Sequence, residues 1–420
     1  MDIKFSKSDQ SLHDEWGKKQ HAGQHISVGS TFFHLDTNER KKKFQDSLCK
    51  NEKEKKLYDW YRDEWYRRPK EFDPGPQPLS LICELVSTCN LACNMCYTIT
   101  EKFQSSVLGV QRMLPWETVV DIIDQAVKIG VPSILFSWRG ESTLYRVKTK
   151  NGEIKTFPDV LDYARKAGIL EVTSLTHGQL LTEEMAEKII QADPSWISFS
   201  IDGLEKDYNL IRTPRNKKED DNYDAFFEVS KRIKMLSEIR NKYPESRTMI
   251  RTNTIYPAIK DYVEKYYQFM KSQGVDLVTV NELMEWSRRD GEDIPFEGLD
   301  LDWGCQYPFQ RLVVSASGVV LPCNGAVHQE DGLVLGIINS NPEHKSLGSG
   351  INFEEKYNRI SLIEAWNSDK LNNIRKLHKE KKRIEINPGC RNCNHGIIKR
   401  GVKYVPEDWD DNKKAWKSNN

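Results

Sequence analysis

The sequence predicts an α/β protein whose core is a parallel sheet with helical crossovers. From residue 79 onward, short apolar runs alternate with amphipathic stretches. Strands that alternate with helices in this way are typical of βα units and a parallel sheet. The alternation by itself fits either an open doubly wound sheet or an incomplete barrel. The predicted strands are 80–86, 133–138, 171–176, 196–201, 249–254 and 277–282.

Helix signals lie between these strands. Pro115 is placed to begin one helix and Gly130 to end it, because proline favours the first helical turn and glycine the position after the last. Thr182 is placed to cap another helix, with acidic residues in its first turn. The apolar face of the first helix is formed by Val119, Ile122, Ile123 and Ala126.

The segment before the sheet is rich in charge. Leu57, Tyr61 and Trp65 recur at four-residue spacing, which predicts a helix with one aromatic face. Basic residues among these aromatics would also suit nucleic acid, but packing on the main domain is the favoured interpretation.

The pattern changes after about residue 300. Two short apolar runs around Ser317-Gly318 predict a hairpin. Residues 361–378 predict a helix, and the final residues predict a frayed polar tail.

Composition bounds the location and the partners. The chain has 420 residues, with 62 Lys and Arg against 62 Asp and Glu, so no overall field attracts nucleic acid or an anionic membrane. No apolar run approaches the roughly 20 residues that span a bilayer. The polar N-terminus lacks a segment suited to secretion, so the expected location is the cytoplasm.

The nine cysteines then become candidate ligands, because a reducing compartment disfavours disulfides. Cys89, Cys93 and Cys96 form a CxxxCxxC group directly after the first predicted strand. Three thiolates on one loop can hold three irons of a [4Fe–4S] cube and leave the fourth open. Zinc and reduced core cysteines are the alternatives, but zinc usually takes four protein ligands and CxxC pairs. Cys49 and Cys83 are interpreted as non-ligands.

This group resembles the signature of the radical S-adenosylmethionine (SAM) superfamily. The resemblance implies that the open iron binds SAM and that one electron cleaves it to a 5′-deoxyadenosyl radical, which abstracts hydrogen from a substrate. It also selects the incomplete (βα)6 TIM-like barrel over the doubly wound sheet, and it implies an electron donor such as flavodoxin or ferredoxin.

Further segments resemble the superfamily's SAM contacts. Residues 136–142 are similar to its Gly-Gly-Glu-Pro loop, with Arg139 in place of the first glycine and Ser142 in place of the proline. A carboxylate there suits the SAM ammonium group. In the similar Thr-Asn-Gly segment, His177 stands where Asn is usual. By resemblance and by position at strand ends, the expected cofactor-binding residues are Gly140, Glu141, Ser142, Thr176, His177, Ser200, Asp202, Arg212, Asn253 and Glu282.

A second cysteine set follows the barrel. Cys305 and Cys323 bracket the predicted hairpin, and Cys390 and Cys393 form a CxxC. This pattern resembles the SPASM or twitch extension of radical SAM enzymes, which implies a second, fully ligated [4Fe–4S] cluster. Four thiolates also suit tetrahedral zinc, which is the alternative.

The expected organisation has four parts. Residues 1–76 form a charged, mainly helical extension and 77–295 the partial barrel. Residues 296–400 form the auxiliary-cluster domain with its hairpin and helix, and 401–420 the polar tail.

The resemblance implies a radical SAM oxidoreductase-type enzyme. The first 75 residues lack the strand pattern of a leader-binding winged-helix domain, which favours a small polar substrate such as a sugar or nucleotide-sugar, with oxidation, deoxygenation or epimerisation as the outcome. A maturase of peptides or proteins is the alternative. A non-catalytic iron–sulfur or zinc scaffold is the alternative of another class.

Overall fold

The computed structural model describes residues 32–34, 46–100, 103, 112–215, 223–281, 283, 304–326, 332–338, 357–386, 390, 393, 405 and 409–417.

Six parallel strands form the centre of the fold, and each lies within a strand predicted from the sequence or extends past it by one residue. Each hydrogen-bonds to the next in chain order, which is the strand order of an incomplete (βα)6 barrel. The strands are β2 (Ser80–Cys83), β3 (Ser133–Leu135), β6 (Glu171–Thr176), β7 (Trp196–Ser200), β8 (Met249–Ile255) and β9 (Leu277–Asn281).

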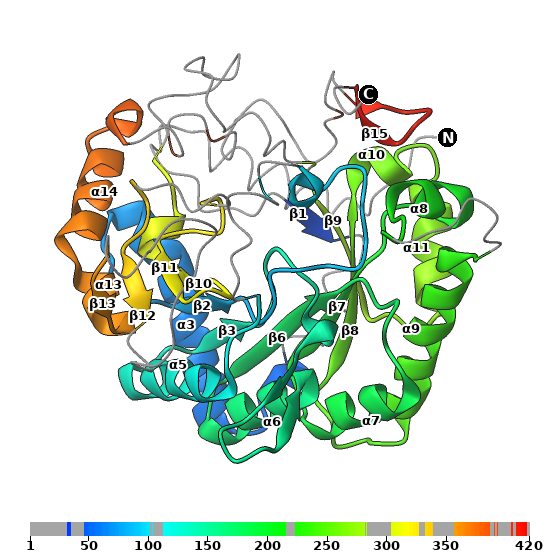
Figure 1. Cartoon of the computed structure of the whole chain (residues 1–420), viewed down its shortest axis with the longest axis horizontal. Helices are drawn as coiled ribbons and strands as arrows, with labels where there is room; N and C mark the ends of the chain where they lie inside the picture. Colours follow the sequence, from blue (N-terminus) through cyan, green and yellow to red (C-terminus); the bar gives the residue numbers. More distant parts are fainter. Residues whose placement is uncertain are drawn as a thin grey trace.

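Helices connect these strands and line the outer side of the sheet (Figure 1). The first, α5, ends at Gly130 in a left-handed conformation and buries its predicted apolar face completely. Burying one such isoleucine contributes about 2 kcal/mol to folding. The helices are α5 (Trp116–Ile129), α6 (Phe157–Ala167), α7 (Glu183–Gln191), α8 (Glu205–Ile211), α9 (Ala225–Asn241), α10 (Tyr256–Ile259) and α11 (Val263–Ser272).

The sheet continues beyond both ends of the barrel. At one end β10 (Arg311–Val314) runs parallel to β2 and returns through β11 (Val319–Leu321), which confirms the predicted hairpin. Next come β12 (Gly336–Ile338) and β13 (Arg359–Ile360). At the other end β1 (Phe32–His34) pairs antiparallel with β9. The outer hairpin of β4 (Arg146–Lys148) and β5 (Ile154–Thr156) precedes α6.

Two predicted helical regions differ in detail. The aromatic helix is α3 (Glu52–Glu71), with Tyr61 buried and Leu57 exposed. The expected helix over 361–378 is two helices, α13 (Leu362–Asn367) and α14 (Asp369–Lys379). The break lies at Ser368, whose extended backbone ends the first helix while its hydroxyl caps the second.

The expected polar tail is wrong at its centre. Residues of β14 (Trp409–Asp410) and β15 (Ala415–Trp416) form an antiparallel hairpin. The reason is burial of two tryptophans, which are 5% and 8% exposed. Figure 1 shows this hairpin beside α10, at the end of the barrel to which β8 leads.

Candidate functional site

The expected SAM-site residues gather at the C-terminal edge of the barrel. Because the six strands are parallel, the loops that follow them meet at the same edge. The cysteine loop follows β2, the Glu141 segment follows β3, and His177 follows β6. Glu282 lies outside the described residues.

The cysteine loop is held by the segment that ends α8. Backbone hydrogen bonds join Ala92 N to Thr213 O (2.7 Å) and Asn94 N to Ile211 O (3.1 Å). The Asn94 side chain also donates to the Leu210 carbonyl at 2.7 Å. These bonds fix the loop between its first and third cysteines from a segment more than a hundred residues away in sequence.

The thiols of the cysteine loop lie close enough together to act on one another electrostatically. Burial raises the pKa of Cys89 and of Cys93 to about 12. Cys96 adds to the rise at both thiols, and Cys89 adds to the rise at Cys93. Within the described residues, no three His, Cys, Asp or Glu side chains are arranged to hold one metal ion. In a [4Fe–4S] cube each thiolate binds a different iron, so the ligands need not converge on one point.

Glu141 is a buried carboxylate at this edge that accepts four hydrogen bonds. Its oxygens accept from the Thr143 hydroxyl (2.6 Å) and amide (3.1 Å), the Thr176 hydroxyl (2.6 Å) and the His177 amide (2.9 Å). Burial opposes its charge, but the hydrogen bonds from Thr143, Thr176 and the His177 amide outweigh burial and hold the pKa of Glu141 below its usual value. Glu141 therefore carries a negative charge at neutral pH, in position for a cation.

His177 links Glu141 to the cysteine loop. Its Nδ1 accepts from the Gln179 amide at 2.9 Å, so the proton resides on Nε2. Nε2 lies 2.8 Å from the Asn90 side-chain oxygen and 3.4 Å from Glu141. Burial lowers the pKa of His177, which keeps the ring neutral. The histidine that replaces the usual asparagine thus orients the loop between Cys89 and Cys93.

Gly140 and Ser142 fix the Glu141 segment. A Cβ on Gly140 would lie 2.2 Å from the Val86 carbonyl oxygen, so only glycine fits this approach to the segment between β2 and the cysteine loop. The Glu141 amide donates to the Thr88 carbonyl at 2.9 Å. The Ser142 hydroxyl donates to the Phe136 carbonyl at 2.5 Å.

Arg139, which replaces the first glycine, has a partner that the sequence did not reveal. Its guanidinium forms a fully buried ion pair with Glu84 (2.5 Å) and stacks on Trp138. Glu84 also accepts from the Ala316 amide, in the turn between β10 and β11, at 2.9 Å. The sequence signal for this ion pair was Glu84, a charged residue directly after the apolar residues of the first strand.

Asp202 and Arg212 form a second buried ion pair at the same edge. The guanidinium donates to the carboxylate at 2.9 Å and 2.5 Å. It also points Nη1 at the Cys93 sulfur, 3.9 Å away. Burial opposes the arginine's charge, but Asp202 and Cys93 raise the pKa of Arg212 above its usual value. Arg212 therefore places a permanent positive charge beside an expected cluster ligand.

The two remaining described residues lie on adjacent strands. Ser200 and Asn253 face each other in the register of β7 and β8. The Asn253 amide donates to the Ser198 hydroxyl at 2.7 Å, so it is engaged within the sheet.

The second cysteine set comes together from three separate segments. Cys323 and Cys393 both act electrostatically on the Cys305 thiol, and burial raises the pKa of that thiol. Cys390 packs with Cys323 on the apolar cluster around β11 and β12. Four cysteine thiolates suit either a [4Fe–4S] cluster or tetrahedral zinc.

Two buried basic side chains support this set. Arg383 donates from Nε to the Cys390 carbonyl at 2.7 Å and from Nη2 to the Cys393 carbonyl. His378 accepts at Nδ1 from the Cys305 amide at 3.3 Å, and its Nε2 is buried with no hydrogen-bond partner in the described part of the chain. The sequence signal was weak, because His378 lies on α14 and Arg383 on the short 3-10 turn Arg383–Glu385, and neither place distinguishes a site residue from a packing residue.

One contact joins the two sites directly. The Trp138 indole N–H donates to the Asn324 carbonyl at 2.9 Å. Trp138 lies three residues before Glu141, and Asn324 follows Cys323. The loop expected to bind SAM and the loop of the second site are therefore fixed against each other.

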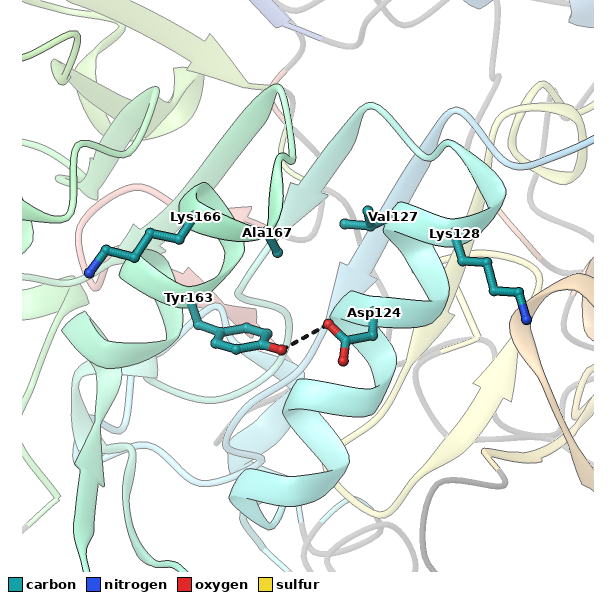
Figure 2. Close-up of a pocket in the computed structure, with 6 residues that line it drawn as sticks. All are labelled: Asp124, Val127, Lys128, Tyr163, Lys166 and Ala167. Atoms are coloured by element: carbon teal, nitrogen blue, oxygen red, sulfur yellow. Dashed lines mark hydrogen bonds between the residues drawn. The ribbon is translucent and has the colours of Figure 1, made fainter.

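A surface groove of about 460 Å³ lies elsewhere, between α5 and α6. Figure 2 shows Tyr163 and Asp124 hydrogen-bonded across it (2.9 Å), while Lys128 and Lys166 point outward. Its lining residues lie on the outer helices and include none of the expected site residues.

None of the described helices combines the length and apolar character that crossing a membrane requires.

Two family models match the chain. The radical SAM superfamily model covers residues 84–239, and the SPASM iron–sulfur cluster-binding domain model covers residues 305–394. These spans contain the first and second cysteine sets respectively.

The curated relatives match either over a short segment or at low identity. A Fe-coproporphyrin III synthase of Methanosarcina barkeri is 30% identical over 34% of this chain, a match that spans only 31% of that protein. A tungsten-containing aldehyde ferredoxin oxidoreductase cofactor-modifying protein of Pyrococcus furiosus is 21% identical over 75% of this chain and 86% of that protein. The solved structure of BtrN with AdoMet and 2-DOIA aligns with a TM-score of 0.45 and 16% identity, covering 78% and 96% of the two chains.

The two matched domains also define the cofactors: SAM, a SAM-binding [4Fe–4S] cluster and auxiliary iron–sulfur chemistry. With a cysteine loop, a hydrogen-bonded Glu141 and a second cysteine set in the matched segments, this chain belongs to the radical SAM superfamily and carries a C-terminal SPASM domain.

Proposed function

We propose that this enzyme cleaves SAM reductively at the C-terminal edge of its barrel and removes hydrogen from a small polar substrate held there. The observation that carries the proposal is the convergence of the cysteine loop, the ionised Glu141 and the Asp202–Arg212 pair at this edge. A structural role alone would not require an anion and a cation to be held beside three thiols.

Each part of the site has a role in this proposal. Cys89, Cys93 and Cys96 hold the cluster, and the negative Glu141 segment receives the ammonium group of SAM. Arg212 offsets negative charge near Cys93, since its guanidinium already points at that sulfur. The Thr176 hydroxyl and the His177 amide keep Glu141 in place.

When bound, the reduced cluster supplies the electron that cleaves SAM, and the resulting 5′-deoxyadenosyl radical takes a hydrogen atom from the substrate. The chain contributes position and seclusion. Glu141 is 3% exposed and His177 is 3% exposed, so the groups that orient SAM lie out of bulk water, where their interactions are stronger.

A sugar or nucleotide-sugar is the substrate class that we propose, with a peptide or protein as the alternative. The described part of the N-terminal region consists of β1 and the segment containing α3, and these elements are not a winged helix. The name of the M. barkeri relative also describes the synthesis of a small molecule.

The second cysteine set most simply holds a cluster that accepts an electron from the substrate radical. Four cysteine ligands would occupy every iron of a [4Fe–4S] cluster and leave none open for substrate. The test is a Cys390→Ala/Cys393→Ala variant, assayed separately for SAM cleavage and for product. We expect cleavage without oxidised product; full product formation would refute the electron-acceptor role.

The central test is anaerobic reconstitution followed by dithionite and SAM. We expect about eight irons per chain and release of 5′-deoxyadenosine. About four irons with activity would assign zinc or nothing to the second site. Well-folded protein that neither binds a cluster nor cleaves SAM would favour a non-catalytic scaffold.

Deuterium transfer identifies the substrate class. Deuterated nucleotide-sugars and deuterated peptides are offered in parallel, and the mass of the released 5′-deoxyadenosine is measured. We expect deuterium from the sugars; transfer from peptides alone would establish the maturase alternative.

A further inference from the structure

The C-terminal hairpin contains two tryptophans that face each other. Trp409 and Trp416 pair across β14 and β15, with ring centroids 5.9 Å apart and planes at 87°. This edge-to-face geometry is the favourable one for aromatic pairs. Both rings are more than nine-tenths buried, so the hairpin packs on the barrel and is not a free end.

The surface that the hairpin covers is the mouth of the barrel. Its tryptophans form an apolar cluster with Leu283, Met95 and Ile255. Leu283 follows β9, Ile255 ends β8, and Met95 belongs to the cysteine loop. Three segments that carry the site therefore rest against one hairpin.

A polar anchor holds the tip of the hairpin. Asp411 forms an ion pair with Lys260, which follows α10, at 2.7 Å. The Asp410 side chain closes the turn by accepting from the amides of Asn412 and Lys413. Figure 1 shows the hairpin beside α10, in agreement with this contact.

The decisive contact is made by Trp416. Its indole N–H donates to the Met95 carbonyl at 3.3 Å. Met95 lies between Cys93 and Cys96, and its neighbour Asn94 is held by α8. The two residues that separate these cysteines are thus fixed by two different segments of the chain.

We propose that Trp416 is a positioning residue of the SAM-cleaving site, which holds the Met95 carbonyl and so keeps the cysteine loop in the conformation that binds SAM. The proposal rests on the proposed function, because it assigns the hairpin to the same site. A preorganised loop gives tighter binding because less order has to be imposed when the ligand arrives. Loss of the contact therefore weakens SAM binding more than it slows cleavage at saturation.

The experiment compares Trp416→Phe with the wild-type chain, both full length and reconstituted. Phenylalanine keeps the aromatic ring and removes only the N–H. SAM is titrated against the reduced cluster, and its electron paramagnetic resonance spectrum gives the dissociation constant. We expect binding about threefold to tenfold weaker, as for loss of one hydrogen bond. The maximal rate of 5′-deoxyadenosine release should change by less than about twofold.

Two further variants separate the contact from general stability. Trp366→Phe removes an equivalent indole bond, to the Gly75 carbonyl at 3.1 Å, in a helix outside the site. Trp409→Phe removes an indole N–H that has no hydrogen-bond partner in the described residues. Both should bind SAM as the wild type does.

Two results would overturn the inference. Unchanged SAM affinity in Trp416→Phe would remove the role of the hairpin, and equal weakening in Trp409→Phe would assign the effect to packing and not to the Met95 bond. Failure of the wild type itself to bind SAM would instead refute the proposed function.

Discussion

The two cysteine sites of this protein are built in opposite ways. The first set lies on one short loop, which backbone hydrogen bonds from α8 and the ring of His177 hold in shape. The second set is drawn from three segments, and buried basic side chains hold their backbone. Three cysteine ligands would leave one iron of a [4Fe–4S] cluster open to a further ligand, whereas four would ligate every iron.

This difference indicates which parts of the molecule each site depends on. The first site depends on ion pairs and hydrogen bonds at the strand ends. Their loss should weaken SAM binding or cleavage before it lowers the iron content. The second depends on long-range packing, and its loss should appear first as missing iron.

The largest expected effect is on the stability of the first site. Arg212→Met removes both guanidinium bonds to one oxygen of the buried Asp202, which should cost about 3–5 kcal/mol of unfolding free energy. Denaturant unfolding of the cluster-free chain measures this. Adding Asp202→Asn should recover part of the loss; a double variant as unstable as the single one would contradict the ion-pair explanation.

A smaller but more specific effect is expected at Glu141. Glu141→Gln removes the negative charge and should lower 5′-deoxyadenosine release about 100-fold, which corresponds to about 2.7 kcal/mol. Iron content should stay at the wild-type value. Glu171→Gln is the matched control, because Glu171 begins the strand that Thr176 ends. Wild-type cleavage by Glu141→Gln would refute the assignment of this carboxylate.

At the second site, Arg383→Met removes both bonds to the cysteine carbonyls. We expect iron to fall from about eight to about four per chain, with SAM cleavage retained. Arg375→Met tests specificity, since Arg375 is also buried and donates to the carbonyls of Pro308 and Trp366. Equal iron loss in both variants would show that the SPASM domain had unfolded, and would contradict a specific role for the bonds from Arg383 to the cysteine carbonyls.

The smallest expected effect concerns the helix break. Ser368→Ala removes the cap of α14 and should lower the unfolding free energy by about 1 kcal/mol. Thermal unfolding measures the loss, and Ser272→Ala, at an exposed hydroxyl that ends α11, is the comparison. A longer, more stable helix in Ser368→Ala would contradict the capping role.

The sequence was informative wherever local pattern decides the structure. The six parallel strands, the helix from Pro115 to Gly130 and the hairpin at Gly318 were all predicted, since each depends on periodicity or on turn residues. The first cysteine group was predicted from its spacing, and the second from its resemblance to the SPASM or twitch extension.

Other features depend on contacts that spacing cannot reveal. The first strand ends at Cys83, earlier than predicted, and the next side chain, Glu84, turns to pair with Arg139. The bond from Trp138 to Asn324 joins residues whose proximity arises only after the sheet has formed. Trp409 and Trp416 flank a polar turn, which is a pattern typical of a hairpin. The many charged residues around them favoured the wrong prediction of a frayed tail.

The pairing of β10 with β2 bears on how separable the two matched domains are. Residues 311–314 bond along the whole of the first barrel strand, and Ala316 completes the acceptor set of Glu84. A fragment that stops after β9 would present β2 as a bare edge, the kind of surface that recruits other strands. Experiments that exchange the C-terminal half between relatives should therefore place their junction after β11. The new chain then keeps its own β10 paired with β2.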